Sequence, residues 1–162
     1  MNIEIVAFGK IRTPGLREAA NYYLKLSSKY VHLQERELRP LQVPDKSPQS
    51  RALIQEKEAS LLLSGQKPGD RSALYLLDEK GKSLRTEEWV ELLQVWRNEG
   101  LTQVTLSIGS SLGFSSALKK KARGLLSLGP QTLPHELARV VLYEQVFRAS
   151  SFIAGHPYHV EG

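Results

Sequence analysis

The sequence predicts an α/β fold, in which a mostly parallel sheet carries helices on both faces. Short apolar runs alternate along the chain with segments of helical periodicity, and turn residues separate them. The connections between successive apolar runs are long enough to hold the crossover helices that parallel strands need. We find no internal repeat, low-complexity tract or linker, so we expect residues 1–162 to form a single domain.

The expected elements follow one another along the whole chain. In order, they are a strand at 3–8, a helix at 14–29, a strand at 31–38, a helix at 47–65, a strand at 73–77, a helix at 86–100, a strand at 104–108, a strand at 125–128 and a helix at 134–153.

Prolines mark most boundaries in the first half. Pro14 suits a first helical turn, because its missing N–H would be unpaired there in any case. The strand at 31–38 is weakly apolar and ends at Pro40, and a loop with further prolines follows. Ser47 next to a proline is typical of a helix start, and Gly65 of its end.

In the second half, charge and glycine give the boundaries. The residues at 78–81 are typical of a turn that closes the strand before them. We expect Thr86 to cap the next helix, because Glu87 and Glu88 then lie in its first turn, at the positive end of the helix dipole. Gly100 ends that helix.

The last helix is apolar around most of its circumference. Leu137, Val140 and Phe147 belong to one face, while Leu142 and Val146 belong to another, so a sheet can cover only part of the helix. We therefore expect a second partner surface. We favour a second copy of the chain, related by a two-fold axis, over a helix sandwiched within one subunit.

Composition limits the possible functions. The chain has no cysteine, which excludes disulfides, thiolate zinc sites and cysteine nucleophiles and fits a reducing compartment. The first ten residues have the pattern of a strand and lack the basic leader of a signal peptide. No apolar run is long enough to span a membrane. We expect a cytoplasmic protein with no membrane and no metal partner. The net charge of +5 favours polyanionic partners.

Three loops that follow strands have the character of a ligand site. They are residues 76–78, 109–113 and 128–133. In open parallel sheets, ligands bind at the carboxyl ends of the strands. All three loops are short on charged side chains, so a ligand would be held by backbone groups and apolar contact. That suits a cofactor that carries adenine.

Two short motifs offer other interpretations. Residues 81–83 imitate the end of a phosphate-binding loop, but its required earlier glycine would fall at Leu76, so we reject that motif. Residues 109–113 match G-x-S-x-G, the elbow of a serine hydrolase, with Ser111 as nucleophile. Its acid and base would be chosen from Glu136, Glu144, His156 and His159. The terminal position of those histidines and the lack of an oxyanion segment count against this alternative.

Four segments carry a resemblance to a known family. They are MNIEIVAFGK, LLDEKGKSLRTEEW, SIGSSLGFS and SLGPQTLPHELARVVLYEQVFRA with the tail GHPYH. Nearly end to end, the chain resembles the bacterial ribosomal RNA large-subunit methyltransferase H family of SPOUT methyltransferases. The resemblance implies a C-terminal trefoil knot, S-adenosyl-L-methionine (AdoMet) as cofactor, an obligate homodimer, and methylation of N3 of a pseudouridine in an intersubunit stem-loop of 23S rRNA.

The resemblance also implies which residues bind the cofactor. They are Leu77, Gly109, Leu128, Gly129, Pro130, Gln131, Thr132 and Leu133. The chain departs from the family pattern at Ser110, where a second glycine is usual, and at Pro130. Ser110 would crowd the cofactor if the backbone there needs positive φ, and Pro130 removes one backbone donor. We expect both departures to affect affinity more than function.

Three residues near the end of the chain are our catalytic candidates. Arg148 can anchor a substrate phosphate or stabilise charge on the base carbonyls, or it can simply pair with Glu144. His159 can accept a proton or bind RNA. Tyr158 offers a stacking face for an unpaired base, and it can also pack the tail.

Other basic residues remain less specific. We expect His135 to be structural, with its ring hydrogen-bonded, and Arg139 to bind rRNA or pair with a carboxylate across the dimer. The run 119–121 with Arg123 is typical of a solvated helix face, with phosphate contact as the minority interpretation. Besides the hydrolase, a non-catalytic RNA-binding module stays open as an alternative function.

Overall fold

A computed structural model describes residues 1–66, 69 and 71–159. Its sheet has five strands in the order β2-β1-β4-β3-β5, and every pairing between neighbours is parallel. The strands are β1 (Asn2–Phe8), β2 (His32–Leu38), β3 (Ser72–Ser83), β4 (Gln103–Ile108) and β5 (Gly124–Ser127). The predicted α/β class and parallel sheet are confirmed.

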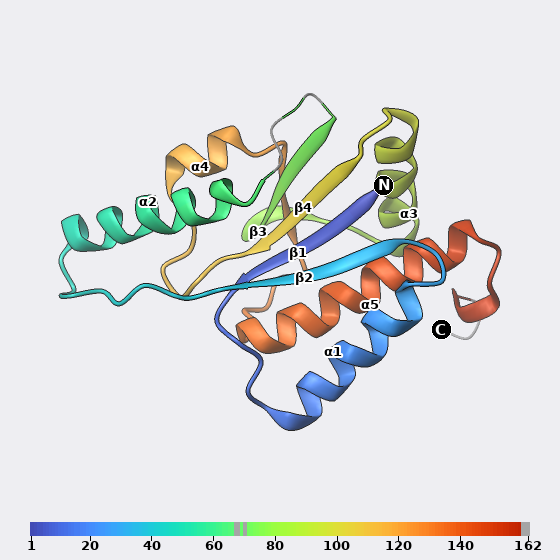
Figure 1. The fold of residues 1–162 in the computed structure, drawn as a ribbon, viewed down its shortest axis with the longest axis horizontal. Helices are drawn as coiled ribbons and strands as arrows, with labels where there is room; N and C mark the ends of the chain where they lie inside the picture. Colours follow the sequence, from blue (N-terminus) through green and yellow to red (C-terminus); the bar gives the residue numbers. More distant parts are fainter. Residues whose placement is uncertain (67–68, 70, 160–162) are drawn as a thin grey trace.

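Helices cover both faces of this sheet (Figure 1). Helices α2 and α4 lie on one face, and α1 and α5 run side by side on the other, together with α3. The helices are α1 (Pro14–Ser27), α2 (Pro48–Ser64), α3 (Thr86–Asn98), α4 (Ser116–Lys121) and α5 (His135–Ile153), followed by a 3₁₀ turn, η1 (Pro157–His159).

The sequence of β1 explains how one strand serves two cores. Ile3, Ile5 and Ala7 belong to the larger core, beneath α1, α3 and α5, whereas Val6 belongs to the smaller core, beneath α2 and α4. Alternate residues of a strand point to opposite faces, so a central parallel strand is apolar on both.

Helix α5 finds its second partner within the same chain. Besides the sheet it contacts α1 and α3, and Leu142, Tyr143 and Val146 are fully buried. The apolar circumference of α5 therefore does not require a second copy, because α1 and α3 supply the extra surface, and the homodimer stays a prediction. Periodicity alone cannot tell a neighbouring helix from a partner subunit.

Strand β3 is longer than predicted, because residues 78–81 do not end it. It pairs with β5 first through Tyr75, Leu76 and Leu77, and again through Lys82 and Ser83, with an irregularity between the two stretches. At this second contact the backbones come so close that a Cβ on Gly81 would lie 2.5 Å from the carbonyl carbon of Leu126. Only glycine fits there.

Most helix and strand ends lie within two residues of expectation. Thr86 is the first residue of α3, and the cap is Arg85, whose backbone N–H donates to the Glu88 carboxylate (2.9 Å). Pro134 is the N-cap of α5 rather than part of its first turn. Leu128 lies beyond β5, whereas Gly155 follows α5 with φ +73°, as a helix stop requires.

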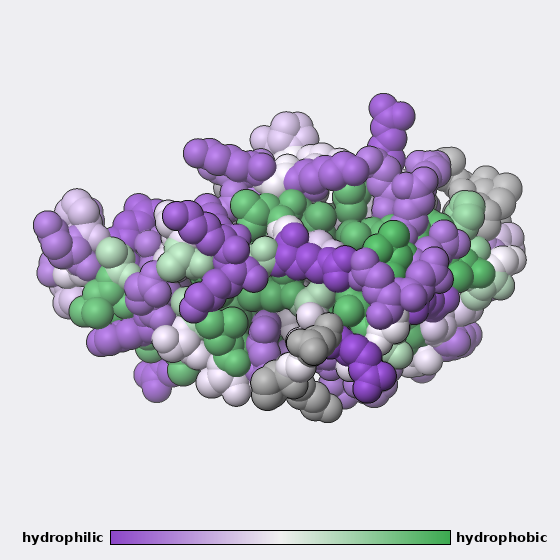
Figure 2. Space-filling view, turned by 90° about the horizontal axis from the view of Figure 1, so that it is seen from above, coloured by the Kyte–Doolittle hydropathy of each residue, from purple (hydrophilic) through white to green (hydrophobic). Residues whose placement is uncertain are grey.

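The surface mixes polar and apolar side chains. In the view from above, apolar side chains gather towards the middle and hydrophilic ones surround them (Figure 2). Leu53 on α2 and Val95 on α3 are among the exposed large apolar residues. Among the described residues, no helix has the length and apolarity needed to cross a membrane.

Candidate cofactor site

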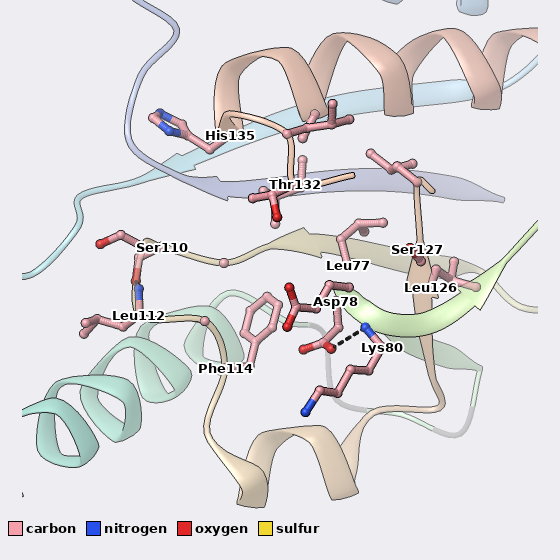
Figure 3. Close-up of a pocket in the computed structure, with 18 of the residues that line it drawn as sticks. Leu77, Asp78, Lys80, Ser110, Leu112, Phe114, Leu126, Ser127, Thr132 and His135 are labelled. Atoms are coloured by element: carbon pink, nitrogen blue, oxygen red, sulfur yellow. Dashed lines mark hydrogen bonds between the residues drawn. The ribbon is translucent and has the colours of Figure 1, made fainter. Parts of the chain in front are cut away.

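A cavity of about 690 Å³ lies where three strands end or separate. Leu77 is the last residue of β3 to pair with β4, Gly109 directly follows β4, and Leu128 directly follows β5. Figure 3 shows Leu77 and Leu126 on one side of the cavity, Ser110 and Leu112 on another, and Thr132 near the start of α5. The volume is within the usual range for small-molecule sites.

The structure brings nearly all the predicted cofactor residues together. The cavity is lined by Leu77, Gly109, Leu128, Gly129, Gln131, Thr132 and Leu133. Pro130 is exposed and does not line it. The three loops identified from the sequence therefore form one site.

A serine holds the start of the loop that follows β5. The Ser127 hydroxyl donates to the Gly129 carbonyl (2.9 Å) and accepts from the Gly129 N–H (3.2 Å). Gly129 has φ +133°, a conformation that other residues rarely adopt. The loop is thus shaped by Ser127 and Gly129, and the missing donor of Pro130 is at an exposed position.

Helix α2 holds the loop that follows β4. The Ser110 hydroxyl donates to the buried Glu58 carboxylate (2.7 Å), which also accepts from the Leu41 N–H (3.2 Å). Gln55 donates to the Leu112 carbonyl (2.7 Å). Among the described residues, only glycines have positive φ, so position 110 does not need the second glycine.

The cavity carries more charge than the sequence indicated. Asp78, Lys80 and Lys119 also line it, because β3 continues past Leu77 and α4 lies opposite. Lys119 pairs with Asp78 at 2.6 Å. Burial raises the pKa of Asp78, but the hydrogen bonds from Lys119 and from the Lys80 N–H outweigh it and hold the pKa below its usual value. Asp78 thus places a carboxylate at the site.

Comparisons with known proteins agree with this geometry. Residues 1–159 match a family model described as "Predicted SPOUT methyltransferase". The chain belongs to the SPOUT methyltransferase family. It is 40% identical over 160 residues to a Clostridium botulinum protein named ribosomal RNA large subunit methyltransferase H, a match that covers 98% of this chain and 99% of the relative. A Streptococcus uberis protein of the same name is 38% identical over 160 residues, with the same coverage.

SPOUT family membership implies a trefoil knot formed by the C-terminal part of the chain. Knotted connections are exceptions to normal chain topology, so local patterns carry no signal for them.

The predicted catalytic residues of this SPOUT chain lie apart from the cavity. Arg148 pairs with Glu144 (2.8 Å) and lies 4.9 Å from the centre of the Tyr158 ring. The Tyr158 hydroxyl donates to Glu144 (3.3 Å), and burial raises the pKa of Tyr158. Ala138 lines the cavity, and Arg148 lies roughly 15 Å further along α5. The side chain of His159 lies outside the described part of the structure.

Arg139 was assigned wrongly. Its side chain is fully buried and contacts Glu35 (2.7 Å) and Glu37 (2.9 Å) of the same chain, so it pairs neither with rRNA nor across a dimer. It also donates to the Gly9 carbonyl (2.7 Å). The sequence gives no hint of these contacts, because their partners are far away along the chain.

His135 and the basic run near α4 are partly as expected. The His135 ring lies against Gly9 and lines the cavity, but we find no hydrogen-bond partner for it in the described ranges. Lys119 faces Asp78, and Arg123 pairs with Glu99 (2.6 Å). Lys120 and Lys121 are exposed, as on a solvated helix face.

The geometry does not favour a hydrolase. A nucleophile elbow strains its serine, yet Ser111 does not have positive φ. Two of its possible partners are engaged elsewhere: Glu136 accepts from the Thr13 N–H (3.0 Å) and Glu144 pairs with Arg148. Within residues 1–66, 69 and 71–159, no group of three or more acidic or histidine side chains is arranged to hold a metal ion.

Proposed function

We propose that this protein is an AdoMet-dependent methyltransferase that methylates N3 of a pseudouridine in 23S rRNA and acts as a homodimer. The observation that carries the proposal is the convergence of three loops on one cavity, within a chain about 40% identical to proteins named ribosomal RNA large subunit methyltransferase H. Such a substrate implies a cytoplasmic location.

The residues of the cavity fit AdoMet. Leu77, Leu126 and Leu133 offer apolar surface to adenine. The backbone at Gly129 has open space beside it, because a Cβ there would meet nothing within 4 Å. Asp78 can accept hydrogen bonds from hydroxyl groups such as those of a ribose. When bound, AdoMet supplies an electrophilic methyl group.

The protein itself must position the base and remove one proton. Methylation replaces the proton on N3, so a basic group must take that proton as the N–C bond forms. We assign proton acceptance to His159, stacking of the base to Tyr158, and stabilisation of charge on the base carbonyls to Arg148. Most of the rate enhancement would then come from alignment.

A homodimer would join the two halves of the site. In one chain Arg148 and Tyr158 form a cluster towards the far end of α5 from the cavity, too distant to touch a base there. A two-fold arrangement can present the Arg148 cluster of one subunit to the cavity of the other. This separation supports the dimer better than the pattern of α5 does.

Calorimetric titration with AdoMet tests the proposal first. We expect saturable binding by the wild-type protein, and its loss in Leu133→Arg, where a long charged side chain would enter the cavity. Leu53→Arg is the matched control, because Leu53 is exposed on α2 and does not line the cavity.

Transfer of labelled methyl to ribosomes that lack the modification completes the test. We expect wild type and Leu53→Arg to label 23S rRNA, and Leu133→Arg to fail. A folded wild-type protein that binds no AdoMet would contradict the proposal and would leave an RNA-binding module as the better explanation.

A further inference from the structure

A second cavity, of about 590 Å³, adjoins the first at the carboxyl ends of the strands. It is formed by the segments that follow β1 and β2, and by the start of α5. His135 lines both cavities, so its ring is a shared wall. We call this second cavity the basic cavity, for the side chains of Lys10, Arg12 and Arg39 that line it.

The three cations of the basic cavity are free to bind a ligand. Lys10, Arg12 and Arg39 are all exposed, and no ion pair involves them within the described residues. Many other cations, including Arg17, Arg36 and Arg139, are held by carboxylates. The charge of the basic cavity is thus not committed to the fold.

The acidic residues of the basic cavity do not cancel that charge. Glu37 contacts Arg17 (2.7 Å) and Arg139 (2.9 Å), in a network of two arginines and two carboxylates that is neutral as a whole. Glu136 accepts from the Thr13 N–H, which lowers its pKa, and contributes one negative charge. Three free cations against one carboxylate leave an excess of positive charge.

We propose that the basic cavity binds backbone phosphates of the substrate RNA beside the nucleotide that is methylated. This inference rests on the proposed function. An RNA whose target base enters the first cavity past His135 must carry its adjoining backbone over a neighbouring surface, and the basic cavity is such a neighbour with free charge. Guanidinium groups match phosphate geometry with two parallel hydrogen bonds, and an ammonium adds a point charge.

The test is a triple variant, Lys10→Gln, Arg12→Gln and Arg39→Gln. Its matched control is Lys25→Gln, Lys29→Gln and Arg97→Gln, which removes the same charge. These residues are exposed, no described ion pair involves them, and they lie near the amino ends of the strands. The substrate is ribosomes that lack the modification. The measured quantities are the KM for ribosomes, its dependence on salt, kcat, and AdoMet affinity by calorimetry.

We expect the basic-cavity variant to raise the KM for ribosomes about tenfold or more and to flatten its salt dependence by about one unit of slope for each phosphate that the variant no longer binds. AdoMet affinity should match wild type, and the control variant should change the KM by less than about threefold. Equal KM values for the two triple variants would overturn the inference, because only net charge would then matter. If wild type neither binds AdoMet nor methylates ribosomes, the proposed function itself fails, which is a separate outcome.

Discussion

At the scale of single residues, Gly81 shows how closely β3 approaches β5. No other described glycine would bring a Cβ so close to several backbone atoms, since those at Leu125 and Leu126 all lie within 2.7 Å of the built position. Backbone cannot swing aside as a flexible side chain can. The close pairing of β3 with β5 therefore requires a residue without a side chain at position 81.

We expect Gly81→Ala to destabilise the fold by about 1–3 kcal/mol or more, because the added methyl group would collide with the β5 backbone. At about 2–4 °C per kcal/mol for a domain of this size, thermal unfolding followed by circular dichroism should detect the loss. Gly15→Ala is the matched control, since a Cβ there meets nothing within 4 Å. Equal unfolding temperatures for the two variants would show that β5 leaves room for a methyl group at position 81.

Glu35 makes stability depend on pH. It accepts from Arg17 and Arg139, both at 2.7 Å. Burial raises the pKa of Glu35, but these hydrogen bonds outweigh it, so its pKa in the folded protein is lower than in the unfolded chain. Its contribution is therefore complete above the unfolded pKa of about 4.3 and is lost as pH falls through the lower folded value.

We expect Glu35→Gln to cost about 1.5–3 kcal/mol at neutral pH, the usual value of a hydrogen bond to a charged group. Its unfolding temperature should also fall less steeply than that of wild type as the pH drops below about 4. Glu18→Gln, at an exposed position on α1, is the control. Parallel pH profiles for wild type and Glu35→Gln would assign the acid sensitivity to other carboxylates.

At the scale of elements, α2 shapes the cavity proposed for AdoMet, although only Arg51 and Gln55 of α2 line it. Glu58 and Gln55 hold the loop after β4 through Ser110 and the Leu112 carbonyl. Glu58 also accepts from Leu41, in the segment that leads into α2. One buried carboxylate thus ties two loops to the same helix.

Removal of this tie should loosen the cavity. We expect Glu58→Ala to weaken AdoMet binding about tenfold, which corresponds to about 1.4 kcal/mol, because the loop after β4 loses its anchor. Glu56→Ala, an exposed change on the same helix, should leave affinity unchanged. Calorimetry on both variants measures the effect. Wild-type affinity in a folded Glu58→Ala protein would mean that the loop holds its own shape.

The same scale shows what the sequence can and cannot reveal. Periodicity and proline spacing indicated most strands and helices, because those signals are local. They missed the second half of β3, since residues 78–83 have the polar, glycine-containing composition of a turn and extend only because β5 pairs with them. Arg139 was misassigned for a related reason, as Glu35 and Glu37 reach it only in the folded chain.

The three loops of the cavity were found because each directly follows a predicted strand. Parallel strands place such loops together at their carboxyl ends. The charge of the cavity was missed, because Asp78 and Lys119 face it only once β3 and α4 are in place. The family resemblance supplied two expectations that patterns could not, namely a knot and AdoMet as the cofactor. It left open whether the Arg148 cluster meets the cavity of a partner subunit.

At the scale of the whole molecule, the distance between the Arg148 cluster and the cavity leads to a prediction about subunits. If each site takes its cavity from one subunit and Arg148 from the other, two inactive variants should complement each other when mixed. Leu133→Arg disables the cavity, and Arg148→Ala removes the guanidinium that pairs with Glu144 and stacks on Tyr158.

We expect each variant alone to lose most methyl transfer to ribosomes. In a heterodimer of the two, one of the two sites combines an intact cavity with an intact Arg148, so co-expressed and tag-purified heterodimers should recover about half of wild-type activity per dimer, since a C2 dimer has two equivalent sites. A Leu133→Arg, Arg148→Ala double variant paired with wild type is the control, because it leaves both mixed sites defective. Recovery in that control but not in the complementing pair would place each whole site within one subunit.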